Sequence, residues 1–285
     1  MAEFELVEQA LRAKSRDGGE GEDRLVIQDH CAAVIDGATD KTGWRDDGRT
    51  GGQIVADTVA AELARPLAEH DPHALVMRLS DAVAARLGAC AIPPQGRPNA
   101  VFAACIPAWG CVVRVGDPGV MIDGSQRPAV KRVDDLLAEA RALYRHLCPA
   151  LPGAGDPGRA AIMPWLSRQH LLQNDASTPW GFGCIDGNPV PARFIELFPL
   201  SDAREVVLCS DGYPAPRPSL AESEALLERL LAEDPDCVAA LRGTKGWDPR
   251  TARSHDDRSY LRLRLRAGPG AGSALAGAAV MARSK

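Results

Sequence analysis

Four aspartates stand next to short apolar runs, where the ends of neighbouring strands can bring carboxylates together. Asp36, Asp117 and Asp211 each follow such a run, and Asp256 precedes the last one. Charged groups are costly at the ends of core strands unless cations neutralise them, and we expect no buried lysine or arginine beside these aspartates. A divalent cation would neutralise them, and ligands that are all oxygen favour Mg²⁺ or Mn²⁺ over Zn²⁺.

The first of these aspartates is followed by Gly37, and glycine lets a backbone carbonyl approach the same cation. The tripeptide Ile-Asp-Gly recurs at 122–124 and 185–187, and Asp-Gly between apolar residues is also the usual hairpin signature. For any single Asp, a turn cap is the commoner role. The ordered set of four is what favours a metal site.

Two apolar segments, 24–28 and 31–35, are separated by Asp29-His30 and predict a β-hairpin. In an antiparallel pair the start of one strand lies beside the end of the other. We therefore expect Glu22 and Asp23 to lie close to Asp36.

The remaining pattern predicts strands in hairpins and helices in groups, which is typical of antiparallel sheets with helices outside and of an α+β fold. Residues 4–14 fit a helix or a strand equally well. Ser219 is a candidate helix N-cap, with Glu222 completing a capping box. Helices are expected at 51–70, 73–87, 133–147, 159–172, 219–232 and shortly after Asp234-Pro235, and strands at 99–106, 111–115, 120–122, 193–198, 205–209 and 260–265.

Composition narrows the class of protein. The 285 residues are 45% hydrophobic, enough for one large core or two small ones, and the net charge of −5 argues against nucleic-acid binding. No apolar run is long enough to cross a bilayer, and the N-terminus lacks the features of a signal peptide. The 8 cysteines contain no Cys-x-x-Cys pair, so we expect small buried side chains in a reducing cytoplasm rather than a zinc site. The abundance of Ala, Arg, Gly and Pro suggests a bacterial source.

The order of the acidic motifs resembles the metal-dependent serine/threonine protein phosphatases of type 2C, the PPM family. The matching pieces are Glu22-Asp23, Val34-Ile35-Asp36-Gly37, Arg114-Val115-Gly116-Asp117, Leu208-Cys209-Ser210-Asp211-Gly212 and Asp256-Asp257-Arg258-Ser259. The resemblance spans about residues 4–266. It implies a four-layer α-β-β-α sandwich of two antiparallel sheets flanked by helix pairs. We expect one phosphatase-like domain at 1–267, with a divergent helical insertion at 131–188, and a flexible tail at 268–285.

Carried over residue by residue, the resemblance implies a site for two Mg²⁺ or Mn²⁺ ions. Asp36 would bridge both ions and the Gly37 carbonyl would bind one of them. Asp211 and Asp256 would hold the other ion. A water bridging the ions would lose a proton and attack phosphorus in line, so Asp36 and Asp211 would act in catalysis through it. Glu22 and Asp23 match the family's acidic pair, which binds the second ion directly or through its waters.

Some positions depart from the family pattern. Ala38-Thr39-Asp40 replaces the histidine and glycines that often follow the first Asp-Gly. Ala215 stands where the family often has an aspartate that helps Asp117 to hold a third ion. The candidate for the phosphate-binding arginine is Arg16, at a longer spacing than usual.

Other hydrolase classes lack their signatures. No cysteine has an arginine six positions later, and neither a Gly-x-Ser-x-Gly elbow nor a P-loop is present. The resemblance to type 2C phosphatases implies a phosphomonoesterase that acts on phosphoserine or phosphothreonine in proteins. A catalytically silent, phosphatase-shaped binding module and a phosphatase of small phosphorylated metabolites remain as alternatives.

Overall fold

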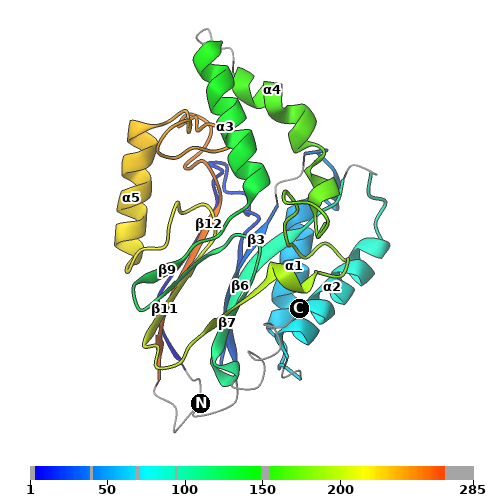
Figure 1. The fold of residues 1–285 in the computed structure, drawn as a ribbon, viewed down its shortest axis with the longest axis vertical. Coiled ribbons are helices and arrows are strands. Elements are labelled where there is room, and N and C mark those ends of the chain that lie inside the picture. The colour runs from blue at the N-terminus through cyan, green and yellow to red at the C-terminus, as the bar shows by residue number, and fades with distance from the viewer. Residues whose placement is uncertain (1–3, 39–40, 69–70, 94–95, 149–154, 267–285) are drawn as a thin grey trace, which may run out of the picture.

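Two five-stranded antiparallel sheets form the centre of the molecule in a computed structural model (Figure 1). The structure describes residues 4–38, 41–68, 71–93, 96–148 and 155–266. One sheet has the strand order β1 (Phe4–Arg12), β12 (Arg258–Leu265), β11 (Glu205–Cys209), β8 (Gly119–Ile122) and β9 (Ser125–Arg127). The other has the order β10 (Ile195–Pro199), β7 (Cys111–Val115), β6 (Ala100–Ile106), β3 (Cys31–Gly37) and β2 (Arg24–Gln28). A small ribbon pairs β4 (Arg45–Asp46) with β5 (Arg49–Thr50).

The core between the sheets follows from the two-residue period of the strands. On β3, Ala32 and Val34 pack towards the other sheet, where they join Leu208 and Leu261. Ala33 and Ile35 of the same strand point the opposite way and pack under helices. Both faces of β3 are therefore buried, which is why its sequence is continuously apolar.

Helices cover the outer faces of the sandwich. The pair α1 (Gly51–Leu63) and α2 (Pro72–Gly88) packs on the sheet of β3, and α5 (Leu220–Glu233) packs on the sheet of β11 (Figure 1). Two further helices, α3 (Arg132–Leu147) and α4 (Pro157–Leu166), contact each other above the sandwich in the view of Figure 1. Short 3-10 turns lie at Pro107–Trp109, Gln169–Leu172 and Ala192–Phe194.

The layers confirm the expected α+β class and the two antiparallel sheets flanked by helices. The predicted hairpin of β2 and β3 is present, and residue pairs such as Arg24 with Ile35 set its register. The ambiguous N-terminal segment is strand β1, because it pairs with β12 at the far end of the chain. That pairing could not be read from local periodicity.

The expectation of a short helix after Asp234 is wrong. Residues 234–247 form turns instead. The Asp234 carboxylate accepts hydrogen bonds from the N–H groups of Val238, Ala239 and Leu241, at 3.0, 2.7 and 3.1 Å. An aspartate side chain that captures backbone donors in this way competes with helix formation. The outer face of the sheet that contains β11 is accordingly covered by α5 together with these turns.

The segment expected to be a helical insertion contributes α3 and α4. Val133, Ile162 and Leu166 of these helices pack with Val101, Phe182 and Cys184 as a small core of their own. The tail expected at 268–285 lies outside the described residues. In the described part of the chain, every helix is too short or too polar to span a membrane.

Candidate functional site

The four aspartates singled out from the sequence line one pocket of about 470 Å³. Each comes from a strand end: Asp36 from β3, Asp117 after β7, Asp211 after β11 and Asp256 before β12. Cys209 of β11 pairs with Tyr260 of β12, so the end of β11, which leads to Asp211, lies beside the start of β12, which follows Asp256. The Gly37 N–H donates to the Glu22 carbonyl at 3.2 Å, which ties the end of β3 to the start of β2.

The carboxylates that line the pocket repel one another. Burial, and then the negative charges of Asp211, Asp23, Asp256 and Asp117, raise the pKa of Asp36 well above its usual value. Asp211 is open to the solvent of the pocket, yet the surrounding protein and the charges of Asp256 and Asp117 raise its pKa to about 7. A cation placed between these carboxylates would relieve the repulsion.

Asp23 is the most deeply buried of the candidate ligands, with 2% of its surface exposed. Its Oδ2 atom has no hydrogen-bond partner among the described residues. Burial, together with the charges of Asp211 and Asp257, raises the pKa of Asp23 to about 7. An orphaned carboxylate oxygen at this depth needs a proton, a water or a cation.

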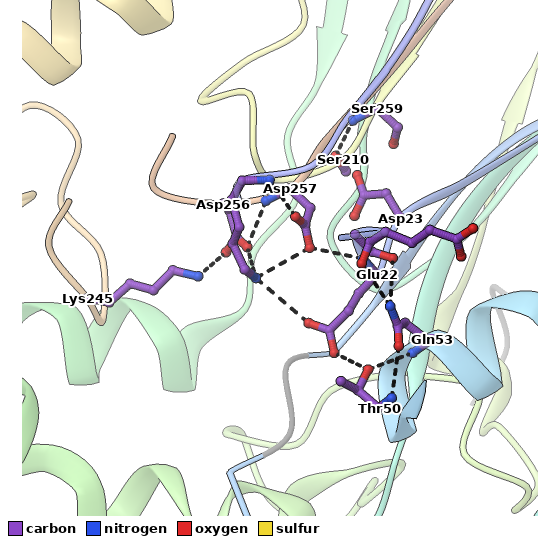
Figure 2. A network of polar contacts seen from close by, with 12 residues as sticks. Glu22, Asp23, Thr50, Gln53, Ser210, Lys245, Asp256, Asp257 and Ser259 are labelled. Atoms are coloured by element: carbon purple, nitrogen blue, oxygen red, sulfur yellow. Dashed lines mark hydrogen bonds and ion pairs between the residues drawn. The ribbon is translucent and has the colours of Figure 1, made fainter. Parts of the chain in front are cut away.

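Two lysines already lie beside Asp256, another carboxylate of the pocket. The Lys14 Nζ atom lies 2.9 Å from Asp256 Oδ1, 3.4 Å from Asp257 Oδ2 and 3.7 Å from Glu22 Oε2. The Lys245 Nζ atom lies 2.5 Å from Asp256 Oδ2 (Figure 2). Burial opposes ionisation of Asp256, but Lys245 and Lys14 hold its pKa below the usual value.

The expectation that no lysine would lie beside the aspartates is therefore wrong. Lys14 follows β1 and Lys245 lies in the turns before β12, so both are distant in sequence from β3. The spacing of the charged residues around Lys14 does not predict that its side chain lies beside Asp256.

Backbone hydrogen bonds fix the carboxylates around Lys14. The Asp257 carboxylate accepts from the Lys14 N–H at 2.7 Å and from the Glu22 N–H at 3.0 Å. The Glu22 carboxylate accepts from the Thr50 hydroxyl at 2.7 Å, and Thr50 is also the N-cap of α1 with Gln53 completing a capping box (Figure 2). These contacts hold Glu22 and Asp257 in place.

A set of cations lines the remaining wall of the pocket and was missed in the sequence. Its members are Lys41, Arg97, Lys131 and Arg159. Burial, and then the positive charges of Arg159, Lys245 and Lys131, lower the pKa of Lys41 to about 8. Cations that crowd one another in this way favour an anion between them.

The carboxylates of the pocket differ in how far side-chain cations already neutralise them. Oxygen ligands around Asp36 and Asp211 suit a hard divalent cation, whereas Lys14 and Lys245 already neutralise Asp256. Within the described ranges, no group of three or more His, Cys, Asp or Glu side chains is positioned to hold a metal ion. A cation beside Asp36 would thus need some movement of these side chains or ligands from water and the backbone.

Comparison with solved structures gives similarity across most of the chain at low identity. PstP/Ppp of Mycobacterium tuberculosis, a serine/threonine phosphatase, is 16% identical, with 92% of this chain and 100% of that chain covered and a TM-score of 0.47. Stp1 of Staphylococcus aureus, also a serine/threonine phosphatase, is 13% identical, with 94% and 98% covered and a TM-score of 0.46.

The PPM phosphatase MsPP of Mycobacterium smegmatis is 16% identical, with 91% of this chain and 99% of that chain covered and a TM-score of 0.44. MsPP is thus a member of the family that the sequence resembles. Neither a model of a protein family nor a curated protein matches the chain.

Asp117 and Arg16, two further predicted site residues, have partners outside the group around Lys14. Asp117 lines the pocket, and its carboxylate is 3.8 Å from Lys131 Nζ, which lies closer to Asp134 at 2.7 Å. The Arg16 guanidinium donates to the Ala252 carbonyl at 3.3 Å on the surface. The roles expected for Asp36, Gly37, Asp211, Asp256, Asp23, Glu22, Asp117 and Arg16 stay predictions.

Proposed function

We propose that the chain is a divalent metal-dependent phosphomonoesterase that acts on phosphoserine or phosphothreonine in proteins. The observation that supports this most is a single pocket that combines the carboxylates of Asp36 and Asp211 with the cations of Lys41 and Arg159. A phosphate monoester carries a dianion, which the cations would bind. The carboxylates would hold the Mg²⁺ or Mn²⁺ that the reaction needs.

The chain's own residues would divide the work between binding and orientation. Arg159 and Lys41 would bind phosphate oxygens, because guanidinium and ammonium groups make charge-assisted hydrogen bonds to phosphate. Asp36, Asp211 and the Gly37 carbonyl would hold the cation. When bound, a divalent cation offsets the charge on phosphoryl oxygens and lowers the pKa of water, so that water can attack at neutral pH. Thr50 would keep the Glu22 carboxylate oriented towards Lys14.

The substrate class rests on the sequence resemblance, which favours phosphorylated proteins. A small phosphorylated metabolite is the alternative, because Arg159 and Leu166 of α4, in the divergent segment, also line the pocket and would limit the room beside a bound phosphate. Competition between a phosphothreonine peptide and small phosphoesters distinguishes the two substrates.

A second candidate function is a catalytically silent binding module with the shape of a phosphatase. The ion pairs of Lys14 and Lys245 with Asp256 favour it, because they occupy carboxylates that a metal would otherwise use. The absence of a ready three-carboxylate group among the described residues points the same way. A silent module would bind phosphate without turnover.

Hydrolysis of p-nitrophenyl phosphate by the full chain tests the proposal. We expect activity with Mn²⁺ that is lost with EDTA and lost in Asp36→Asn. Asp29→Asn is the matched control, because it makes the same change at the exposed turn of the same hairpin. Equal activity in Asp36→Asn and Asp29→Asn would refute the metal site. No activity in the wild type, with phosphate still bound, would favour the silent module.

A further inference from the structure

Three carboxylates surround one lysine ammonium beside the candidate metal site. Glu22, Asp256 and Asp257 lie within 3.7 Å of Lys14 Nζ, and Lys245 pairs with the second oxygen of Asp256. The Lys14 side chain is 27% exposed, and the side chains of Glu22 and Asp257 are 8% and 6% exposed. This cluster is therefore largely shielded from bulk solvent.

The cluster resembles a cation site in which a lysine side chain supplies the positive charge. Glu22 and Asp257 are fixed by hydrogen bonds from Thr50 and from backbone N–H groups. The Asp257 N–H also donates to Asp256 Oδ1 at 3.0 Å, so the arrangement does not depend on Lys14 alone. Carboxylates that are held together in this way need a positive charge among them.

A divalent ion and Lys14 would compete for the same oxygens. An ion bound to Asp256 Oδ1 at the usual ligand distance of about 2.1 Å would lie no more than about 5 Å from the Lys14 nitrogen. Like charges this close repel strongly where solvent is excluded. Lys14 is a compact point charge, as the divalent ion is, so it can fill that position.

We propose that the Lys14 ammonium takes the place of one divalent ion, so that the chain binds one ion fewer than its carboxylates would otherwise hold. This inference rests on the proposed function, in which Asp36, Asp211 and the Gly37 carbonyl hold the remaining ion. It departs from the two-ion site that the sequence resemblance implies. The chain would thus need one Mg²⁺ or Mn²⁺, with Lys14 as a fixed internal cation.

Counting bound Mn²⁺ tests the inference without using activity. Calorimetric titration and the fraction of free Mn²⁺ by electron paramagnetic resonance give the number of ions on the full chain. We expect one ion on the wild type and two on Lys14→Met. Lys41→Met is the matched control, because it removes the same charge from the wall of the same pocket; we expect one ion on it.

Equal numbers of ions on the wild type and Lys14→Met would overturn the inference, and so would two ions on the wild type. An extra ion on Lys41→Met as well would also overturn it, because a general loss of positive charge would then suffice. No ion on the wild type but one on Lys14→Met would support the inference while contradicting the proposed metal-dependent activity. Failure of the inference about Lys14 can therefore be distinguished from failure of the proposed metal-dependent activity.

A second measurement covers the case in which Lys14→Met does not fold. Side-chain ¹⁵N signals of lysine ammonium groups in the wild type report on ion-paired lysines directly. We expect the Lys14 signal, assigned by its loss in Lys14→Gln or Lys14→Arg, to persist at saturating Mg²⁺ as that of an ion-paired ammonium in slow exchange with water. Loss of this signal through fast exchange with water on addition of Mg²⁺ would show that the ion displaces Lys14, and the inference would be wrong.

Discussion

Gly37 and Gly52 pass so close that neither can carry a side chain. A Cβ on Gly37 would lie 2.5 Å from the Gly52 carbonyl oxygen and 2.8 Å from that of Glu22. Both contacts are with backbone, which cannot move aside as a flexible side chain can. The start of α1 is thereby pressed against the end of β3, next to Asp36.

Gly37→Ala is expected to lower the free energy of unfolding by about 3 kcal/mol or more, because the added methyl group has no room. It should also abolish hydrolysis by displacing Asp36. Gly88→Ala is the control, since a Cβ there meets nothing within 4 Å. We expect that change at the end of α2 to be neutral or to stabilise by about 0.5 kcal/mol. Urea unfolding of both variants makes the comparison, and similar midpoints would contradict the close packing.

Arg114 of β7 makes a buried polar network that should be costly to remove. Its side chain is 1% exposed and pairs with Glu196 at 2.8 Å. It also donates to the carbonyls of Pro118, Arg127 and Pro128. Arg114→Met removes these hydrogen bonds, and we expect it to lower the free energy of unfolding by about 2–3 kcal/mol, because Glu196 is partly exposed and can be solvated by water.

The matched control for this prediction is Arg264→Met on β12. Arg264 pairs with Glu5 at 3.0 Å, but the two side chains are 58% and 53% exposed. Exposed ion pairs contribute little, so we expect a change of less than about 1 kcal/mol. Thermal and urea unfolding measure both variants. A loss in Arg114→Met no larger than that in Arg264→Met would show that the network does not stabilise the fold.

The folded pKa of Lys41 predicts how phosphate binding changes with pH. Burial and the neighbouring cations lower that pKa to about 8, so Lys41 is charged at pH 7 and mostly neutral at pH 9.5. If it binds phosphate, affinity for inorganic phosphate should fall about tenfold between pH 7.5 and 9.5, the loss of one charge-assisted hydrogen bond. Calorimetry with Lys41→Gln should show a much weaker dependence. Parallel curves for the two proteins would remove Lys41 from the phosphate site.

The lowered pKa of Lys41 also predicts how stability changes with pH. Because the folded pKa of Lys41 lies below its unfolded value of 10.5, the unfolded chain binds more protons between about pH 8 and 10.5. The wild type should therefore gain stability relative to Lys41→Gln as pH rises through that window. Chemical denaturation at pH 7.5 and 10 measures the difference, and a relative loss at pH 10 would contradict the shift.

The parts that could be predicted from the sequence were those set by local signals. Alternating and continuous apolar runs identified β3, β6 and β11, and the expected N-cap at Ser219 accepts from the Glu222 N–H at 3.2 Å. The convergence of Asp36 and Asp211 on one pocket followed from their common position at strand ends. Strand β1 could not be assigned, because its partner β12 is remote in sequence.

The cations of the pocket could not be predicted for the same physical reason. Lys14 reaches Asp256 across 242 positions of sequence, and no spacing rule connects them. Arg159 lies on α4, whose place above the sandwich depends on packing with α3 rather than on its own pattern. Local pattern thus located the carboxylates and left out the groups that balance their charge.

Phosphate release from a phosphothreonine peptide is the most direct test of the central claim that the Asp36 pocket hydrolyses phosphate monoesters. The measurement compares the wild type, Asp36→Asn and the control Asp29→Asn with Mn²⁺ present. We predict steady release by the wild type and Asp29→Asn and none above background by Asp36→Asn. Release by Asp36→Asn at the rate of the wild type, with the same dependence on Mn²⁺, would contradict the account.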